Sequence, residues 1–272
     1  MGSLIYVEGI IGVGKSTYCK EIAERMNYRV IEEPVKSNPY LARFYEDPKK
    51  YAYEMQIYLL HRRIGLQQLA AAESLYSPDF AGAMLDRSLF GDRVFEELHH
   101  EDGNISDIQH HAYLTAIRNM QLMIFPPTIL IFLDAEPEVA LNRIKERARG
   151  CEVGIGIDYL ERLTQRYHRL IQDAKDGRYP WSHAVKILHK SWNHNTMTSS
   201  QWDAEAASLK RFQEEVDGNV SKEWQKDLFE MGINSQIPHS PSTVAHGPSN
   251  GDSSVGRVEA EDLGGDVQSR TR

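Results

Sequence analysis

The chain has 272 residues, of which 41% are hydrophobic, enough for a substantial core in one large α/β domain or two small ones. Its formal net charge of −8 disfavours a nucleic-acid backbone as partner, and no run of about eighteen apolar residues predicts a membrane span. The first residues lack the charged leader and apolar core of a secretion signal, so we expect a cytoplasmic protein. Only Cys19 and Cys151 occur, which supports neither a disulfide framework nor a cysteine metal site.

A phosphate-binding loop lies near the N-terminus, between a predicted strand and a predicted helix. Leu4 to Glu8 alternates as a strand does, and the motif G-x-x-x-x-G-K-S runs from Gly9 to Ser16. Glycines let backbone N–H groups surround a phosphate, the lysine adds a mobile charge, and the helix adds the positive end of its dipole. The serine hydroxyl is placed to bind the Mg²⁺ that accompanies ATP. The expected ATP-binding residues are Gly9, Gly12, Gly14, Lys15, Ser16 and Thr17.

Strands and helices alternate after this loop. Further strands are predicted at residues 29–32, 83–85, 128–133 and 184–188. Helices are predicted at residues 40–45, 51–74, 89–99, 107–123, 137–148, 157–173, 201–216 and 221–231. Because strand–helix–strand units close into parallel sheets covered on both faces, we expect an α/β, three-layer fold around a central parallel five-stranded sheet.

Acidic residues follow three of the predicted strands. Glu33, Asp86 and Asp134 each stand where a strand ends, and the carboxyl ends of parallel strands meet at one crevice, beside the phosphate loop. Asp86 and Asp134 both qualify as the acidic partner of Mg²⁺, and spacing alone does not choose between them. Arg87 is a candidate for neutralising charge on a transferred phosphoryl group; the alternative is a helix-capping aspartate beside a surface arginine.

Arginines gather near residue 145. Arg143 and Arg147 stand four apart on one predicted helix face, and Arg149 begins a glycine-rich loop of the kind that closes over bound phosphates. The alternative is a solvated helix face, because Lys145 and Glu146 lie alongside.

Two other features are assigned no chemistry. The pairs His99-His100 and His110-His111 lack the i, i+4 spacing of a helical zinc site, so we expect ordinary exposed histidines. Residues 235–272 contain no aromatic side chain and are rich in Ser, Gly and acidic residues, which predicts a disordered tail after a folded domain at residues 1–234. The aromatic side chains of residues 201–231 are expected to pack on the core.

These separated motifs together resemble the deoxynucleoside kinase family, particularly its bacterial and phage branch of purine-type enzymes, over about residues 4–171. The match comprises the phosphate loop, Glu33-Pro34-Val35, the run N-P-Y-L-A-R-F-Y-E-D-P-K-K-Y-A from Asn38, Gln56, Asp86-Arg87-Ser88, and R-x-x-x-R-x-R with Glu152 and Tyr159-Leu160. The resemblance implies a P-loop kinase fold with a helical lid at about residues 143–156. It also implies ATP-dependent phosphorylation of a deoxynucleoside 5′-hydroxyl in nucleotide salvage, with Mg²⁺ accompanying the ATP.

The resemblance implies the chemistry of individual residues. Glu33 matches the glutamate that takes the proton from the 5′-hydroxyl, and Arg87 matches the arginine that stabilises the phosphates and helps to fix that base. Together with Lys15 these are the expected catalytic residues. The family pattern also favours Asp86 over Asp134 as the partner of Ser16 at Mg²⁺.

Substrate-binding residues follow from the same resemblance. Tyr45 and Glu152 match residues that hold the 3′-hydroxyl, and Gln56 matches the glutamine that bonds the base edge. Arg63 lies seven residues after Gln56 on the same helix face, and Asp92 matches its partner. Relatives with this pair accept purine deoxynucleosides or deoxycytidine, so deoxyadenosine, deoxyguanosine or deoxycytidine is expected and thymidine is least favoured. A buried Arg–Asp pair can also be purely structural.

Two other functions stay open at this point. One is a nucleoside monophosphate kinase of the same fold, which would need an extra positive site for the acceptor phosphate. The other is a catalytically silent kinase-like subunit, against which the intact Lys15, Ser16, Glu33 and Arg87 argue. A homodimer is the expected assembly, with ATP and a deoxynucleoside as ligands and neither nucleic acid nor membrane as partner. The recognised motifs do not cover the chain beyond about residue 178, so no residues are assigned to binding the adenine of ATP.

Overall fold

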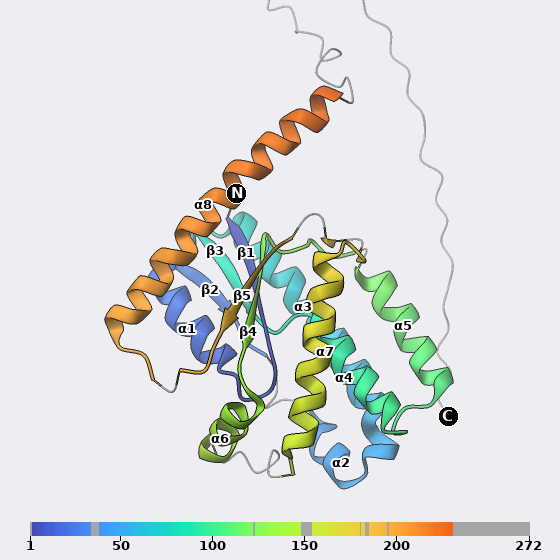
Figure 1. The fold of residues 1–272 in the computed structure, drawn as a ribbon. Helices are drawn as coiled ribbons and strands as arrows, with labels where there is room; N and C mark the ends of the chain where they lie inside the picture. The colour runs from blue at the N-terminus through green and yellow to red at the C-terminus, as the bar shows by residue number, and fades with distance from the viewer. Residues whose placement is uncertain are drawn as a thin grey trace, which may run out of the picture. The chain divides into compact units, whose positions relative to one another are not determined.

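The computed structural model describes residues 2–33, 38–121, 123–147, 154–179, 181–182, 185–194 and 196–230, with backbone alone from residue 218 (Figure 1). The chain divides into two units, residues 1–225 and 226–272, and the fold belongs to the first. The expected boundary at residue 234 stays a prediction, and the expected tail at residues 235–272 lies outside the described residues. Among the helices of the described part, none is long and apolar enough to cross a membrane.

Five parallel strands form one sheet in the order β2-β3-β1-β4-β5. The strands are β1 (Ser3–Glu8), β2 (Tyr28–Ile31), β3 (Gly82–Asp86), β4 (Ile129–Asp134) and β5 (Lys186–Ser191). The central β1 is buried along its whole length, as expected for a strand covered on both faces. The predicted five-stranded parallel sheet is confirmed, and the ends of β1, β2 and β3 bring distant parts of the sequence to one edge.

Helices cover both faces of this sheet. They are α1 (Lys15–Met26), α2 (Leu41–Glu46), α3 (Pro48–Tyr76), α4 (Leu89–Glu101), α5 (Asp107–Gln121), α6 (Pro137–Arg147), α7 (Ile157–Lys175) and α8 (Ser199–Glu230). Figure 1 shows α1 and the first part of α8 on one face and α3, α4 and α7 on the other. This arrangement confirms the predicted three-layer α/β fold.

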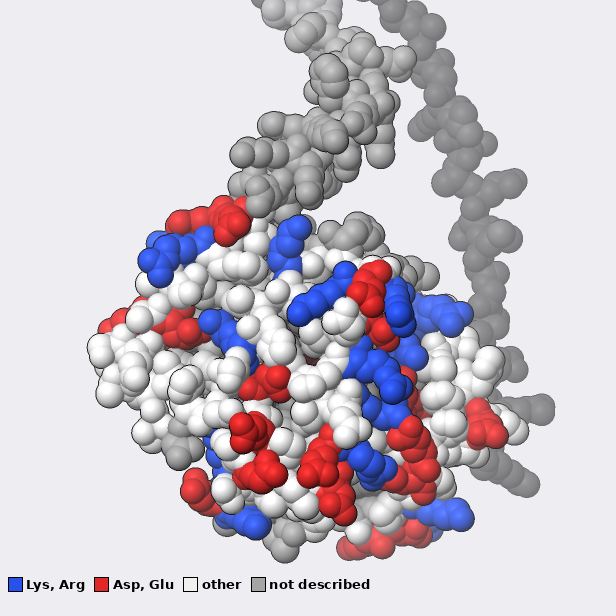
Figure 2. Space-filling view, viewed as in Figure 1, with Lys and Arg blue, Asp and Glu red and all other residues white. Residues whose placement is uncertain are grey.

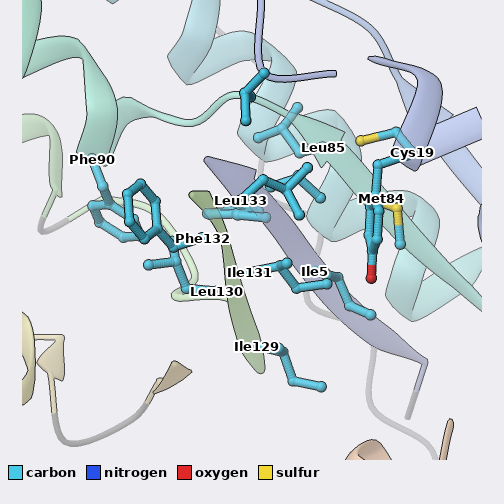
Figure 3. Close-up of a cluster of buried hydrophobic side chains, with 14 of the residues drawn as sticks. Ile5, Cys19, Met84, Leu85, Phe90, Ile129, Leu130, Ile131, Phe132 and Leu133 are labelled. Atoms are coloured by element: carbon cyan, nitrogen blue, oxygen red, sulfur yellow. The ribbon is translucent and has the colours of Figure 1, made fainter. Parts of the chain in front are cut away.

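The core fills the space between the sheet and its helices (Figure 3). Ile5 of β1 and Ile131 of β4 lie beside each other, and both are completely buried. On the opposite face of β4, Phe132 points toward Phe90 of α4. Each such side chain contributes about 1.5–3 kcal/mol by leaving water. Packing of these apolar strand residues therefore fixes the positions of the strand ends, where the polar residues of the site lie.

Three of the differences from the predicted elements have a clear physical reason. Helix α3 begins at Pro48 rather than at residue 51, because proline suits the first helical turn and the Asp47 side chain accepts a hydrogen bond from Lys50 N at 3.2 Å. Strand β5 runs to Ser191, because its ladder with β4 continues as far as Asp134. A single 32-residue helix, α8, replaces the two helices expected at residues 201–216 and 221–231. An isolated Gly218 costs a helix only about 1 kcal/mol relative to alanine.

Aromatic residues of α8 pack as predicted where their side chains are described. Trp202 is buried and Phe212 packs against the same core, whereas Trp224 and Phe229 lie where the structure describes backbone alone. Trp202 lies with its ring centroid 6.2 Å from that of Tyr18 on α1. This contact attaches α8 to the helix that follows the phosphate loop.

The outer face of α4 and α7 carries charges of both signs. Figure 2 shows basic and acidic side chains interleaved there, in agreement with ion pairs from Arg162 to Asp102 and from Arg166 to Glu97 at 2.6 and 2.7 Å. Charged residues of opposite sign are therefore paired on this face.

Candidate active site

The phosphate loop adopts a backbone conformation that requires its glycines. Gly9, Gly12 and Gly14 have φ angles of 149°, 80° and 109°, which side-chain-bearing residues rarely adopt. A Cβ at Gly9 would also lie 2.5 Å from Leu133 O, and one at Gly12 would lie 2.5 Å from Ala140 O. The loop is therefore pressed between the end of β4 and α6. Helix α1 begins directly after it, as a phosphate-binding helix N-terminus does.

Lys15 lies across this loop. Its Nζ donates hydrogen bonds to Gly9 O at 3.1 Å and to Ile10 O at 2.9 Å. Burial lowers the pKa of Lys15 to about 8, and the charge of Arg87 adds to this effect, while Asp86 and Glu33 partly offset it. An anion bound in the loop would favour the charged form, so Lys15 is suited to holding phosphate.

Ser16 and Asp86 form an oxygen pair beside the loop. Ser16 Oγ donates to Asp86 Oδ2 at 2.5 Å, and Asp86 Oδ1 is buried with no hydrogen-bond partner among the described residues. A hydroxyl and a carboxylate are ligands that Mg²⁺ prefers, so the donor set fits this ion. Asp134, the other candidate, is instead engaged by His168 and His189, whose Nε2 atoms lie 2.9 and 2.8 Å from its Oδ2. The geometry favours Asp86.

Glu33 stands next to the end of β2 between two arginines. Arg63 Nη2 donates to Glu33 Oε1 at 2.5 Å, and Arg87 Nε donates to Oε2 at 3.4 Å. Burial alone would raise the pKa of Glu33, but the charges of Arg63, Arg87 and Lys15 outweigh it and lower this pKa to about 2. Glu33 is therefore an ionised carboxylate at neutral pH, near the lysine of the phosphate loop.

The predicted Arg63–Asp92 pair is present, and it reaches farther than the sequence suggested. Arg63 Nε is in ion-pair contact with Asp92 Oδ1, so the guanidinium of α3 links an aspartate of α4 to Glu33. Both Arg63 and Asp92 are buried. Burial raises the pKa of Asp92 to about 7 against the opposing charge of Arg63. The charge of Arg63 therefore only partly offsets the effect of burial on Asp92.

Two buried side chains of α3 have polar atoms without a hydrogen-bond partner. Gln56 is 1% exposed, and its Oε1 has no hydrogen-bond partner in the described part of the chain; the same holds for Arg63 Nη1. Each buried polar atom left without a partner costs about 1–3 kcal/mol, so such atoms indicate the place of a polar ligand. Tyr45 on α2 is 38% exposed and interacts electrostatically with Tyr159 on α7.

The predicted lid is described only in part. Of residues 143–156, the structure describes 143–147 and 154–156, so Arg149 and Glu152 lie outside the described residues. Arg143 donates to Val13 O at 2.7 Å, to Trp192 O at 3.2 Å and to His194 O. It therefore joins the phosphate loop to the segment after β5, which a solvated helix face would not do. Arg147, the last residue of α6, is exposed.

Sequence reasoning missed several residues around the loop. Trp192, which follows β5, would lie with its Nε1 3.4 Å from a Cβ on Gly14. Glu8 is completely buried and accepts hydrogen bonds from Ser88 N and Oγ at 2.7 and 2.6 Å, and from Tyr167 Oη at 3.1 Å. A carboxylate at the last position of a central buried strand must find partners, and this signal was available for Glu8. None was available for Trp192 or Tyr167.

One histidine contradicts the expected exposure. His99 is 5% exposed, and its ring lies 4.8 Å from that of Phe44, centroid to centroid. Burial lowers the pKa of His99 to about 4, so it stays neutral. Its neighbour His100 instead stacks on His110 at 4.1 Å, toward the surface. Adjacent residues on a helix point in different directions, and here only the first of the pair faces inward.

The loop, its lysine and the oxygen pair fit the phosphates and the metal ion of a nucleoside triphosphate, and Glu33 lies at the same edge of the sheet. Fold and site together define a phosphotransferase of the P-loop class.

Comparison with known proteins identifies the family. A model of the deoxynucleoside kinase family matches residues 5–228. A deoxyadenosine kinase of Dictyostelium discoideum is 36% identical over 192 residues, which are 71% of this chain and 73% of the relative. A deoxyguanosine kinase of the same organism is 34% identical over 192 residues, 70% of this chain and 64% of the relative.

A solved structure is also similar. The deoxyadenosine kinase from M. mycoides, with products dCMP and a flexible dCDP bound, has a TM-score of 0.62 and 27% identity, covering 76% of this chain and 98% of that one. The chain belongs to the deoxynucleoside kinase family. It is a phosphotransferase that acts on deoxynucleosides with a nucleotide as phosphoryl donor.

Proposed function

We propose that the protein transfers the γ-phosphoryl group of Mg²⁺·ATP to the 5′-hydroxyl of deoxyadenosine, deoxyguanosine or deoxycytidine, in nucleotide salvage. The observation that carries this proposal is the ion cluster in which buried Arg63 joins Glu33 to Asp92. It puts an ionised carboxylate beside groups that can form hydrogen bonds with a nucleobase. The relatives support the choice of base, because two are named after purine deoxynucleosides and a third holds dCMP.

Glu33 is the proposed general base. Its low pKa keeps it ionised, and it lies within hydrogen-bond reach of Arg87, which would also contact the phosphoryl group. If Arg63 turns from Glu33 toward a bound base, the charge that most strongly lowers the pKa of Glu33 moves away. Glu33 then becomes a stronger base when the acceptor is present.

The proposed phosphate-side residues position the phosphates and stabilise their negative charge. Gly9, Gly12 and Gly14 shape the loop, and Thr17 in the first turn of α1 is a further proposed ATP-binding residue. Lys15 and Arg87 stabilise charge on the transferred group. Ser16 and Asp86 would hold Mg²⁺, which when bound neutralises charge on the phosphate oxygens. Arg143, Arg147 and Arg149 are the proposed lid arginines.

The proposed acceptor pocket uses donor and acceptor atoms together. Gln56 presents an amide, Asp92 a carboxylate and Arg63 a guanidinium, a set that matches the mixed donors and acceptors on purine and cytosine edges. Tyr45 and Glu152 are the proposed partners of the 3′-hydroxyl.

Domain extent and assembly are also proposals. We propose a kinase domain at residues 1–234 and a homodimer in the cytoplasm. Leu69 and Tyr76 of α3 and Ile108 of α5 are 45%, 80% and 84% exposed, and a second copy would cover these apolar side chains. Sedimentation velocity tests this directly: a single species at monomer mass at micromolar concentration would contradict the dimer.

The function is tested by incubating the protein with Mg²⁺·ATP and each of the four deoxynucleosides or their 5′-monophosphates, and separating the products by chromatography. We expect transfer to purine deoxynucleosides or deoxycytidine and little to thymidine. Transfer to monophosphates alone would establish a monophosphate kinase instead. No transfer from protein that binds ATP would establish a silent subunit.

Base recognition has its own test in Arg63→Met, with the adjacent exposed Arg62→Met as control. We expect the KM for the nucleoside to rise by about 10- to 100-fold while the KM for ATP changes little, because the lost hydrogen bonds involve a charged group. The acid limb of the pH profile should also move to higher pH, because Glu33 loses its strongest cationic neighbour. Equal KM values in the two variants would contradict the proposed role of Arg63.

A further inference from the structure

A buried chain of hydrogen bonds lies behind Arg87, on the side away from Glu33. Arg87 Nη1 donates to Tyr167 Oη at 2.6 Å, and Tyr167 Oη in turn donates to Glu8 Oε2 at 3.1 Å. All three side chains are buried, with Tyr167 and Glu8 completely inaccessible. These residues come from the end of β3, from α7 and from the end of β1. The family motifs include Arg87, but neither Tyr167 nor Glu8 has a role in the proposed chemistry.

The far end of this chain is fixed by the backbone of α4. Glu8 Oε1 accepts hydrogen bonds from Ser88 N at 2.7 Å, from Ser88 Oγ at 2.6 Å and from Gly91 N at 3.3 Å. Since one carboxylate oxygen is held by three donors, the other can point only toward Tyr167. Hydrogen bonds to a buried carboxylate are short and strong, so Glu8 is a rigid anchor.

Aromatic contacts also restrict the Tyr167 ring and the Arg87 guanidinium. The Tyr167 ring stacks on Phe132 of β4 with centroids 5.8 Å apart, and the Arg87 guanidinium carbon lies 4.6 Å above the ring of Phe95. Arg87 itself has a φ angle of 66°, a strained conformation for a residue with a side chain. This backbone conformation sets the direction in which the Arg87 side chain leaves the main chain. Its contacts with Tyr167 and Phe95 then set the position of the guanidinium group.

We infer that Tyr167, anchored by Glu8, is a positioning residue that sets the direction of the Arg87 guanidinium. Because Tyr167 accepts the hydrogen bond from Nη1, the Nε of Arg87 is directed at Glu33. In this position the arginine can contact both Glu33, the proposed general base, and the transferred phosphoryl group. This inference rests on the proposed roles of Arg87 and Glu33. Without the phenol, the guanidinium would be free to turn on its own axis, and a small misplacement at a reacting centre slows transfer strongly.

The alternative is a tyrosine that only fills space, and a matched pair of variants separates the two. Tyr28, at the start of β2, is another buried tyrosine, and its hydroxyl donates a hydrogen bond to Gln213 Oε1 on α8 at 2.6 Å, outside the site. We expect Tyr167→Phe to lower kcat by about 10- to 100-fold with KM values changed by less than about threefold, and Tyr28→Phe to change kcat by less than about twofold. Equal kcat values for the two variants would overturn the inference.

A double-mutant cycle tests whether Tyr167 acts through Arg87. Lysine at position 87 keeps a positive charge but lacks the fork that reaches Tyr167 and Glu33 together. In the Arg87→Lys background, Tyr167→Phe should therefore cost less than about a further twofold in kcat. A loss as large as in the wild-type background would mean that Tyr167 acts independently of Arg87, and the inference would be wrong.

Crystal structures of the wild type, Tyr167→Phe and Tyr28→Phe give a readout that needs no activity. We expect the Arg87 guanidinium to leave Glu33 in Tyr167→Phe and to keep its place in Tyr28→Phe. An unmoved guanidinium in Tyr167→Phe would overturn the inference. Because this position is read even from a protein that phosphorylates no nucleoside, failure of the inference and failure of the proposed function are distinguishable.

Discussion

The proposed phosphate side and the proposed acceptor side of the site are built in opposite ways. The phosphate side centres on a continuous stretch, Gly9 to Ser16, whose glycines shape the backbone and whose carbonyls hold Lys15. The acceptor side consists of the side chains of Glu33, Arg63 and Asp92, which come from three separate segments, and Arg87 contacts Glu33 from the phosphate side. The residues of the phosphate loop are contiguous in the sequence, whereas those of the acceptor side come together only when the chain folds.

This difference teaches where each half is vulnerable. A loop of backbone donors tolerates change in distant residues as long as its glycines and its lysine are kept. A cluster of buried charges depends on every member, because removing one leaves its partners uncompensated in a medium of low dielectric constant. The two halves should therefore respond separately to mutation, and the following predictions test that separation.

The largest effect is expected on the phosphate side. Lys15→Met removes the charge held over the loop carbonyls, and kcat/KM should fall by about 10³-fold, because this charge acts on the transferred phosphoryl group. Lys20→Met, which breaks only the exposed ion pair with Glu32, is the control. Calorimetric binding of the deoxynucleoside should be retained in both variants. Loss of nucleoside binding in Lys15→Met would show that the two halves are not separate.

The next largest effect is on stability and concerns the packing of Gly91 against Glu8 and Tyr167, the residues that hold Arg87. A Cβ on Gly91 would collide with Glu8 Oε2 and would lie 2.6 Å from Tyr167 Oη. Gly91→Ala should therefore lower the free energy of unfolding by about 2–3 kcal/mol, measured by urea denaturation. Gly65→Ala, at a helical position with no atom within 4 Å of the new Cβ, should raise it by about 0.5–1 kcal/mol. Equal changes would contradict the close packing around Glu8.

A smaller effect concerns pH and again belongs to the phosphate side alone. Lys15 has a pKa lowered to about 8 by burial, so it loses its proton in the nucleotide-free protein as the pH rises through 8. ATP binds the protonated form, so its affinity should fall by about tenfold from pH 7 to pH 9, with proton uptake on binding. Calorimetry in buffers of different ionisation enthalpy measures this uptake. Lys15→Arg should abolish the slope, and a slope that persists would assign it to another group.

Much of the fold was predictable from the sequence, for local reasons. Thr128 to Leu133 is an unbroken run of β-branched and apolar residues, and Pro34 and Pro48 mark boundaries, so strands and helices fall near their expected places. The exceptions are positions where tertiary context decides. β5 extends to Ser191 because β4 offers it a ladder, and α8 continues through Gly218.

The site was predictable only in part. The phosphate loop carries its own signature, and strand ends indicated Glu33 and Asp86. Gln56 and Arg63 carry no such signal, and only family resemblance singled them out. The link from Arg63 to Glu33 and the chain from Arg87 through Tyr167 to Glu8 join residues 30 to 159 positions apart, and no periodicity records them.

The central claim, that Glu33 is the base on the acceptor side, is tested most directly by Glu33→Gln beside its exposed neighbour variant Glu32→Gln. Single-turnover phosphoryl transfer and calorimetric nucleoside binding are measured for both. We predict that transfer falls by about 10²-fold or more in Glu33→Gln while the Kd for the nucleoside changes by less than about threefold, because glutamine keeps the shape and an oxygen acceptor for Arg63, whose charge stays paired with Asp92. Glu32→Gln should behave as the wild type. Unchanged transfer in Glu33→Gln would contradict the claim and remove Glu33 from the chemistry.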